Sequence, residues 1–290
     1  MSDGPPRDNL TGGAWLIADM ALNIWALSIV KALGLGYPAA QLVFLRAAVG
    51  LLLIAPWVWR RRAAFRNLDD LHIHALRVGL SVITLTASFF AISRVPLALF
   101  TAMNFTRPLV TMIMAAGILG ERIGPRRWIA AGVALIGVMI AVDPSAAPLG
   151  AGVAALMVVI LTGSGAIIAT RRLRPAPEIV MMAFYTGGLA AVTGPIAAWL
   201  WVPVAAGHWL PLLAVGVFSQ VAQFCFLRAH YNGEAGFLSV LSYLSLILSV
   251  GVGYFVFAEV PTVRFAVGAV LVVAAAGWVT WRVRRDASAR

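Results

Sequence analysis

Residues 179–227 read IVMMAFYTGGLAAVTGPIAAWLWVPVAAGHWLPLLAVGVFSQVAQFCFL, and none of them carries a formal charge at pH 7. A helix needs about 20 predominantly apolar residues to cross the hydrocarbon core of a bilayer, so this stretch is too long for one crossing. Trp201, Pro203 and Gly207 interrupt it near its middle. It therefore predicts two transmembrane helices joined by a short connection.

The composition of the whole chain agrees with a membrane environment. Of its 290 residues, 61% are hydrophobic and only 11% are charged, and the mean hydropathy is +0.92. Soluble domains are about a quarter charged, so an ordinary soluble fold is excluded. The net charge of +11 comes from short basic clusters between apolar runs, a pattern that favours a lipid bilayer and not nucleic acid as the partner. The single Cys225 excludes a disulfide framework and a zinc site built from several cysteines.

Long apolar runs predict helices because every backbone amide in lipid must be bonded within its own segment. The predicted fold is an all-α integral membrane protein with ten transmembrane helices, near residues 11–33, 40–59, 72–93, 96–119, 127–142, 150–170, 177–201, 208–229, 234–258 and 262–281. The run at 127–142 is short, so hydropathy alone also allows eight or nine spans.

The distribution of basic residues predicts the orientation. If both termini are cytoplasmic, most of the 22 basic residues, Arg77 included, fall on the cytoplasmic side, as the positive-inside rule requires. The first apolar run contains Asp19 and no A-x-A-like cleavage site, so no signal peptide is expected. We expect a multi-pass protein of the bacterial inner membrane, with a disordered tail at 1–10 and a basic tail at 282–290.

The two halves of the chain share a polar pattern. Five spans in each half are an odd number, so homologous halves would be inverted relative to each other, as in many transporters. An alignment of Glu121 with Glu259 places one polar helix face on another, Thr101, Asn104, Arg107 and Thr111 on Ser239, Ser242, Ser245 and Ser249. We expect repeats at 11–142 and 150–281 that enclose a central cavity. The alternative is that these hydroxyls bond to carbonyls of their own helix or a neighbour.

Short motifs in a fixed order carry a family resemblance. They are Ala26–Lys31, Pro38 followed by Leu45-Arg46-Ala47, Pro108, Gly120-Glu121 with Gly132 and Gly137, and Ala258-Glu259 with Gly268. In these motifs the chain resembles the EamA-type proteins of the drug/metabolite transporter superfamily, which implies ten spans in two five-helix repeats. It looks most like the bacterial exporters of aromatic and other neutral amino acids. The second half departs from the pattern, with Leu246 in the position of Pro108.

Two charges near mid-bilayer are the first candidates for substrate binding, because such charges are costly there. We expect Asp19 to attract an ammonium group and Arg107 a carboxylate; alternatively they pair with each other or with polar neighbours. The other expected cavity residues are Asn23, Thr84, Ser88, Thr101, Asn104, Phe105, Ser164, Tyr185, Gln220, Gln223, Ser239, Ser242, Tyr243 and Ser245. For the aromatic members, packing is an open alternative.

Other residues have expected structural or gating roles. Pro108 is expected to kink its helix, and Gly251 and Gly253 offer a second soft point, so these three form a candidate hinge or gate unless the glycines serve packing. Lys31 and Arg46 lie near helix ends, where long side chains reach the interface.

The motifs also limit the class of function. No phosphate-binding loop of an ATP-driven pump is present, and no metal set or nucleophile–base pair indicates an enzyme. No charged ring or filter motif indicates a channel. We expect a secondary transporter without cofactor or metal that exports small amphipathic metabolites, most typically neutral amino acids, by alternating access. The alternative is an exporter of cationic drugs, and coupling to a proton is left open.

Overall fold

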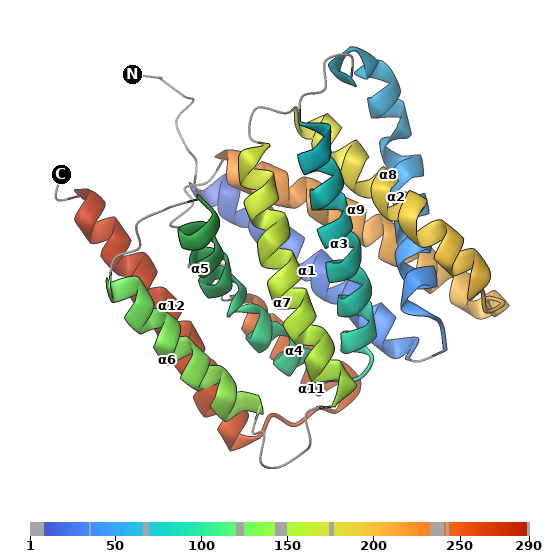
Figure 1. Cartoon of the computed structure of the whole chain (residues 1–290). Helices are drawn as coiled ribbons and strands as arrows, with labels where there is room; N and C mark the ends of the chain where they lie inside the picture. Colours follow the sequence, from blue (N-terminus) through green and yellow to red (C-terminus); the bar gives the residue numbers. More distant parts are fainter. Residues whose placement is uncertain are drawn as a thin grey trace.

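The computed structural model of the chain describes residues 9–34, 36–65, 70–119, 125–142, 150–173, 177–232, 241 and 244–288, and its described elements are all helices (Figure 1). In chain order they are α1 (Asn9–Ala32), α2 (Ala39–Arg60), η1 (Arg62–Phe65), α3 (Leu71–Ile92), α4 (Leu97–Asn104), α5 (Arg107–Leu119), α6 (Pro125–Val142), α7 (Ala151–Arg172), α8 (Glu178–Trp199), η2 (Ala206–His208), α9 (Trp209–Asn232), α11 (Leu244–Phe257) and α12 (Val263–Ser288).

Six of the described helices are long and apolar enough to cross a membrane: α1, α2, α3, α7, α8 and α9. The uncharged stretch that was expected to form two helices forms α8 and α9. Shorter apolar helices occupy Leu244–Phe257 and Val263–Ala275. The expected span at 234–258 begins in residues outside the described part of the chain, so the count of ten stays a prediction.

The expected span at 96–119 is divided into α4 and α5. At the division the N–H of Thr106 donates to the carbonyl of Met103 at 3.0 Å, which is the tighter i to i−3 pattern and not the α-helical one. Pro108 follows in the first turn of α5, where its missing N–H leaves no helical bond unmade. The kink that was expected within one helix is therefore a break just before the proline.

The helices pack in cross-half pairs. α1 packs on α9, α2 on α8, α3 on α7, α4 on α11, and α6 on α12. The α6–α12 pair lies at one edge of the bundle, whereas α1, α3 and α7 lie toward its centre (Figure 1). Small residues allow close approach: Gly188 of α8 faces Val78 of α3, and Gly216 of α9 faces Val49 of α2.

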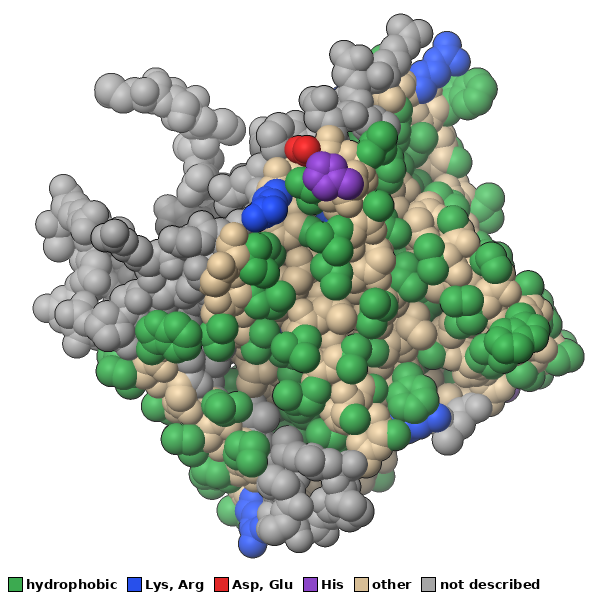
Figure 2. All heavy atoms as spheres, viewed as in Figure 1, with side chains coloured by type: hydrophobic (Ala, Val, Ile, Leu, Met, Phe, Trp, Pro, Cys, Tyr) green, Lys and Arg blue, Asp and Glu red, His purple; other side chains and the backbone are tan. Residues whose placement is uncertain are grey.

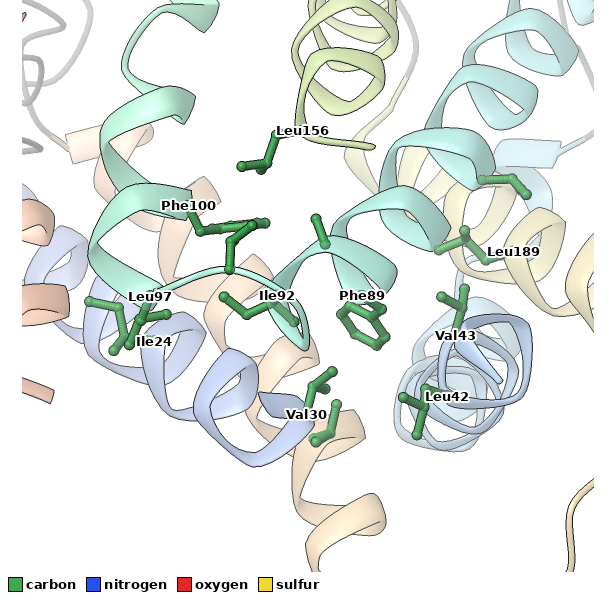
Figure 3. Packing of buried hydrophobic residues seen from close by; sticks show 14 of the residues in the cluster. Ile24, Val30, Leu42, Val43, Phe89, Ile92, Leu97, Phe100, Leu156 and Leu189 are labelled. Atoms are coloured by element: carbon green, nitrogen blue, oxygen red, sulfur yellow. The ribbon is translucent and has the colours of Figure 1, made fainter. Parts of the chain in front are cut away.

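The main hydrophobic core gathers residues from most of these helices. One cluster of buried residues includes Phe89 and Ile92 of α3, Ile24 of α1, Leu97 of α4 and Leu156 of α7 (Figure 3). All five side chains are buried. This core joins α1, α3, α4 and α7, and the cavity described below lies beside it, since Phe89 belongs to both.

The outer surface is apolar. Large side chains such as Leu52, Trp199, Leu210 and Phe255 are 75–85% exposed. In Figure 2 hydrophobic side chains cover the middle of the visible face, while the coloured charged and histidine side chains lie toward its ends. Exposed apolar surface of this extent is unfavourable in water and favourable in lipid. The chain is thus built as a multi-pass membrane protein.

Candidate functional site

A cavity of about 410 Å³ lies among the central helices, which is a typical volume for a small-molecule site. Its lining comes from α1 to α5 and from α7 to α9. The lining residues are Asn23, Ala26, Leu27, Arg46, Arg77, Ser81, Thr84, Leu85, Ser88, Phe89, Phe100, Asn104, Arg107, Gly163, Ala166, Ile167, Thr170, Tyr185, Ser219 and Gln223.

The cavity brings together part of the predicted set. The predicted residues that line it are Asn23, Thr84, Ser88, Asn104, Arg107, Tyr185 and Gln223. The predicted residues that lie elsewhere are Asp19, Thr101, Phe105, Ser164, Gln220 and Ser245. Ser239, Ser242 and Tyr243 lie outside the described residues.

Five of the predicted residues that lie outside this cavity have other surroundings in the structure. Thr101 donates to the carbonyl of Leu97 on its own helix at 3.0 Å, and Phe105 packs against the core. Ser164 is fully buried and donates to the carbonyl of Arg107 at 3.2 Å. Gln220 points between helices, where its Oε1 would lie 2.7 Å from a Cβ on Gly50 of α2. Ser245 lies on α11, which supplies no lining residue.

Three arginines dominate the charge of the cavity. Sequence reasoning identified Arg107, but it placed Arg46 at the interface and Arg77 in the cytoplasm; all three line the cavity. A signal for Arg77 exists in the sequence, because Arg77, Ser81, Thr84 and Ser88 follow one another in steps of four, three and four and so share a helix face. The positive-inside rule counts Arg77 among the basic residues on the cytoplasmic side, so it does not predict Arg77 as a cavity residue.

The arginines differ in how fully they are bonded. Arg77 donates from Nε to Oγ1 of Thr170 at 2.8 Å and from Nη1 to the carbonyl of Met181 at 3.1 Å. Among the described residues, Arg46 donates to the Tyr185 hydroxyl alone, at 3.4 Å. The Nη2 of Arg107 reaches the carbonyl of Val159 at 3.4 Å, and its buried Nε has no partner among the described residues.

Arg107 is packed tightly against α7. Its guanidinium lies over Gly163, where an added Cβ would stand 2.7 Å from Cζ and closer still to Nη2. The glycine therefore makes the space that the guanidinium occupies. Tyr185 lies near the other two cations, with its ring centroid 6.0 Å from Cζ of Arg46 and 5.8 Å from Cζ of Arg77, within the range of cation–π attraction.

Asp19 lies behind the cavity wall. Its side chain is buried, and its Oδ1 accepts a hydrogen bond of 2.6 Å from Nδ2 of Asn23, which lines the cavity. The structure thus gives Asp19 a polar neighbour on its own helix and separates it from the cavity by one side chain.

The hydroxyl groups of the lining are mostly satisfied within the protein. Ser81, Thr84 and Ser88 donate to carbonyls one turn earlier at 2.7–2.8 Å. Bonding of hydroxyl groups to carbonyls of their own helix was the alternative to a free polar lining. Thr84 also bonds Oγ1 of Thr162 at 2.7 Å. Among the three arginines of the lining, Arg46 and Arg107 make fewer and longer described hydrogen bonds than Arg77.

An ion pair links α1 to the segment between α11 and α12. Lys31, at the end of α1, lies 2.8 Å from Oε1 of Glu259 and donates to the carbonyl of Val95 at 2.7 Å. Oε2 of Glu259 accepts from the N–H of Leu97 at 2.9 Å. An added Cβ on Gly253 would lie 2.8 Å from the same Oε2. This arrangement gives Lys31 and Glu259 specific partners, so Lys31 does not simply extend to the interface.

Comparison with known proteins identifies the family. The model of the EamA-like transporter family matches residues 12–142 and again 150–281. A solved crystal structure covers 96% of this chain and 100% of its own at 20% identity, with a TM-score of 0.68, which supports the same fold.

Several curated transporters are similar over most of their length. The pseudopaline exporter CntI of Pseudomonas aeruginosa is 29% identical, covering 86% of this chain and 88% of that protein. The riboflavin transporter of Rhizobium johnstonii is 29% identical, covering 93% and 91%. The S-adenosylmethionine uptake transporter of Rickettsia felis is 22% identical, covering 96% and 95%. These names do not favour amino-acid exporters, which the sequence resemblance had suggested. The chain belongs to the EamA-like transporter family.

Proposed function

We propose that the chain is a secondary transporter that exports small amphipathic metabolites bearing a carboxylate. The observation that carries this proposal is the cavity lined by Arg46, Arg77 and Arg107, because guanidinium groups bind carboxylates through paired hydrogen bonds. Phe89, Phe100 and Tyr185 in the same lining offer an apolar wall.

Neutral amino acids with bulky side chains remain within this class. Their carboxylate would bind Arg107, and their ammonium group would approach Asn23, behind which Asp19 lies. The proposed outward direction is that of the pseudopaline exporter among the relatives, whereas the S-adenosylmethionine transporter of Rickettsia felis acts in uptake. The riboflavin and S-adenosylmethionine transporters support a family that handles organic metabolites of several kinds.

The pattern of helix pairs supports alternating access by two repeats. In the expected repeats, α1 corresponds to α7 and α3 corresponds to α9. A pair between α1 and α9 in one repeat order should therefore have a counterpart between α7 and α3. Both pairs are present. The other pairs, α2–α8, α4–α11 and α6–α12, each join two helices that correspond to one another in the two expected repeats. Two similar units around one site are what a transporter that opens in turn to each side requires.

The alternative of cationic drugs is less well supported. A cationic substrate would meet three charges of its own sign in the cavity, and like charges at close range repel strongly where water is scarce. The acidic group considered for that role, Asp19, lies behind Asn23.

Uptake into proteoliposomes tests the proposal. The panel consists of phenylalanine, 3-phenylpropionate, riboflavin and the cation tetraphenylphosphonium, each with and without an imposed proton gradient. We expect uptake of at least one carboxylate, its loss in Arg107→Gln, and its retention in Arg60→Gln, since Arg60 is exposed at the end of α2. Movement of tetraphenylphosphonium without any carboxylate would reject the proposal, and dependence on the gradient would identify proton coupling.

A further inference from the structure

We infer that the cavity selects organic anions with at least two negative charges over those with one. This inference rests on the proposed function and narrows its substrate class. It follows from the number of cations around the cavity, from the bonds they leave unmade, and from the shape of the apolar lining.

The charge balance of the described cavity is strongly positive. Arg46, Arg77 and Arg107 line it, and no aspartate or glutamate is among the lining residues that the structure describes. The nearest carboxylate identified through a hydrogen bond to the lining is Asp19, one side chain behind the wall. Even when Asp19 is ionised, three cations against one anion leave two positive charges uncompensated by described residues.

Uncompensated cations inside a membrane protein are unfavourable unless water or a ligand supplies the missing interactions. The ion pair between Lys31 and Glu259 includes none of the three arginines. A ligand with a single carboxylate would neutralise half of the excess, whereas a dicarboxylate would neutralise all of it.

The unused hydrogen-bond donors divide between two guanidinium groups. A guanidinium has five N–H donors in a planar fork. Arg77 uses two bonds at 2.8 and 3.1 Å, but Arg46 and Arg107 each make one described side-chain bond, and both are long at 3.4 Å. Two separate forks are thus available, and each suits one carboxylate in the paired geometry.

The lining also limits the size and the apolar character of the ligand. Tyr185 is shared by Arg46 and Arg77, and Phe89 and Phe100 bring aromatic rings to the same cavity. The volume of about 410 Å³ accommodates a compact ligand of the size of an amino acid or somewhat larger. An aromatic dicarboxylate is therefore a suitable probe.

The test compares two acids that differ chiefly in the number of carboxylates. Purified full-length protein in detergent is titrated by calorimetry with 2-phenylsuccinate, a dianion at neutral pH, with 3-phenylpropionate, a monoanion, and with phenethylamine, a cation. We expect the dissociation constant of the dianion to be at least about tenfold lower than that of the monoanion. Arg46→Gln and Arg107→Gln should each bring this ratio close to one, and Arg60→Gln should preserve it.

The comparison within the wild-type protein keeps the inference falsifiable if a variant fails to fold. Equal affinity for the two acids, weaker binding of the dianion, or no binding of the dianion would each overturn it. If 3-phenylpropionate binds in an Arg107-dependent manner without preference for the dianion, this inference fails and the proposed function stands. If only phenethylamine binds, both fail.

Discussion

Nζ of Lys31 lies 2.8 Å from Oε1 of Glu259, so the end of α1 is tied to the connection between α11 and α12. The same two side chains bond the backbone at Val95 and Leu97, at the connection from α3 to α4. Five helices from both halves of the chain, α1, α3, α4, α11 and α12, thereby meet at one point.

A double-mutant cycle measures this tie. Lys31→Met and Glu259→Gln should each lower the temperature of unfolding, because each leaves a largely buried partner without its counter-charge. The coupling energy should be about 1–2 kcal/mol. Thermal unfolding of both single variants and the double variant in the same detergent gives the value. Strictly additive effects would show that the two charges do not interact energetically.

Gly253 and Gly251 should respond differently to substitution by alanine. Gly253→Ala should destabilise the protein, since the new methyl group would lie 2.8 Å from Oε2 of Glu259. At Gly251 such a group would meet no described atom within 4 Å beyond the neighbouring backbone of its own helix. Gly251→Ala should be neutral or gain up to about 1 kcal/mol in helix stability. Thermal unfolding measures both variants.

Two further measurements complete this comparison. The loss in Gly253→Ala should disappear in a Glu259→Ala background, where the crowded carboxylate is absent. Transport by Gly251→Ala tests the hinge predicted from the sequence, because a required hinge would lose transport without any loss of stability. Equal destabilisation by both glycine substitutions would contradict the packing explanation.

Gly163→Ala should weaken substrate binding. The added methyl group overlaps the guanidinium of Arg107 and must displace it, and misplacement of a binding group by about 1 Å reduces transport efficiency by about tenfold to a hundredfold. Gly132→Ala on α6 is the control, because its new group meets nothing within 4 Å. Concentration dependence of uptake separates the effect on affinity from any loss of inserted protein. Unaltered affinity in Gly163→Ala would argue against a role for Arg107 in binding.

Asn104→Asp should lower affinity for carboxylates by about tenfold. The change adds a negative charge to the cavity wall with almost no change in shape, and a charge a few ångströms from the ligand is worth a few kcal/mol before screening. Asn232→Asp, at the end of α9, is the matched control, because both amides donate to the carbonyl one turn earlier on their own helix. Competition by 2-phenylsuccinate against a transported substrate measures the effect. Stronger competition in Asn104→Asp would contradict binding of anions at this site.

The long helices could be predicted because lipid leaves the backbone few alternatives. Residues 179–227 gave α8 and α9 once Pro203 and Gly207 were recognised as interruptions. The division of α4 from α5 was visible only in part: Pro108 indicated a disturbance there, but not that the helix would end at Asn104 and restart at Arg107.

The candidate site was predictable where residues share a helix face. Asn104 and Arg107 were identified by their three-residue spacing, and both line the cavity, whereas Thr101 on the same predicted face bonds to the carbonyl of Leu97 instead. Contacts between distant segments leave no such periodic signal. The space that Gly163 provides for Arg107 depends on how α5 meets α7, and so it could not be derived from either helix alone.

The division between α4 and α5 also affects how movement of this protein should be measured. Leu99 lies on the first segment and Ile113 on the second, with Phe105 and Thr106 between them outside either helix. Spectroscopic labels at these two positions report on α4 and α5 separately. A change in the distance between the labels therefore records a change in the angle between the two helices. A single label on either helix cannot distinguish this change of angle from a tilt of α4 and α5 together.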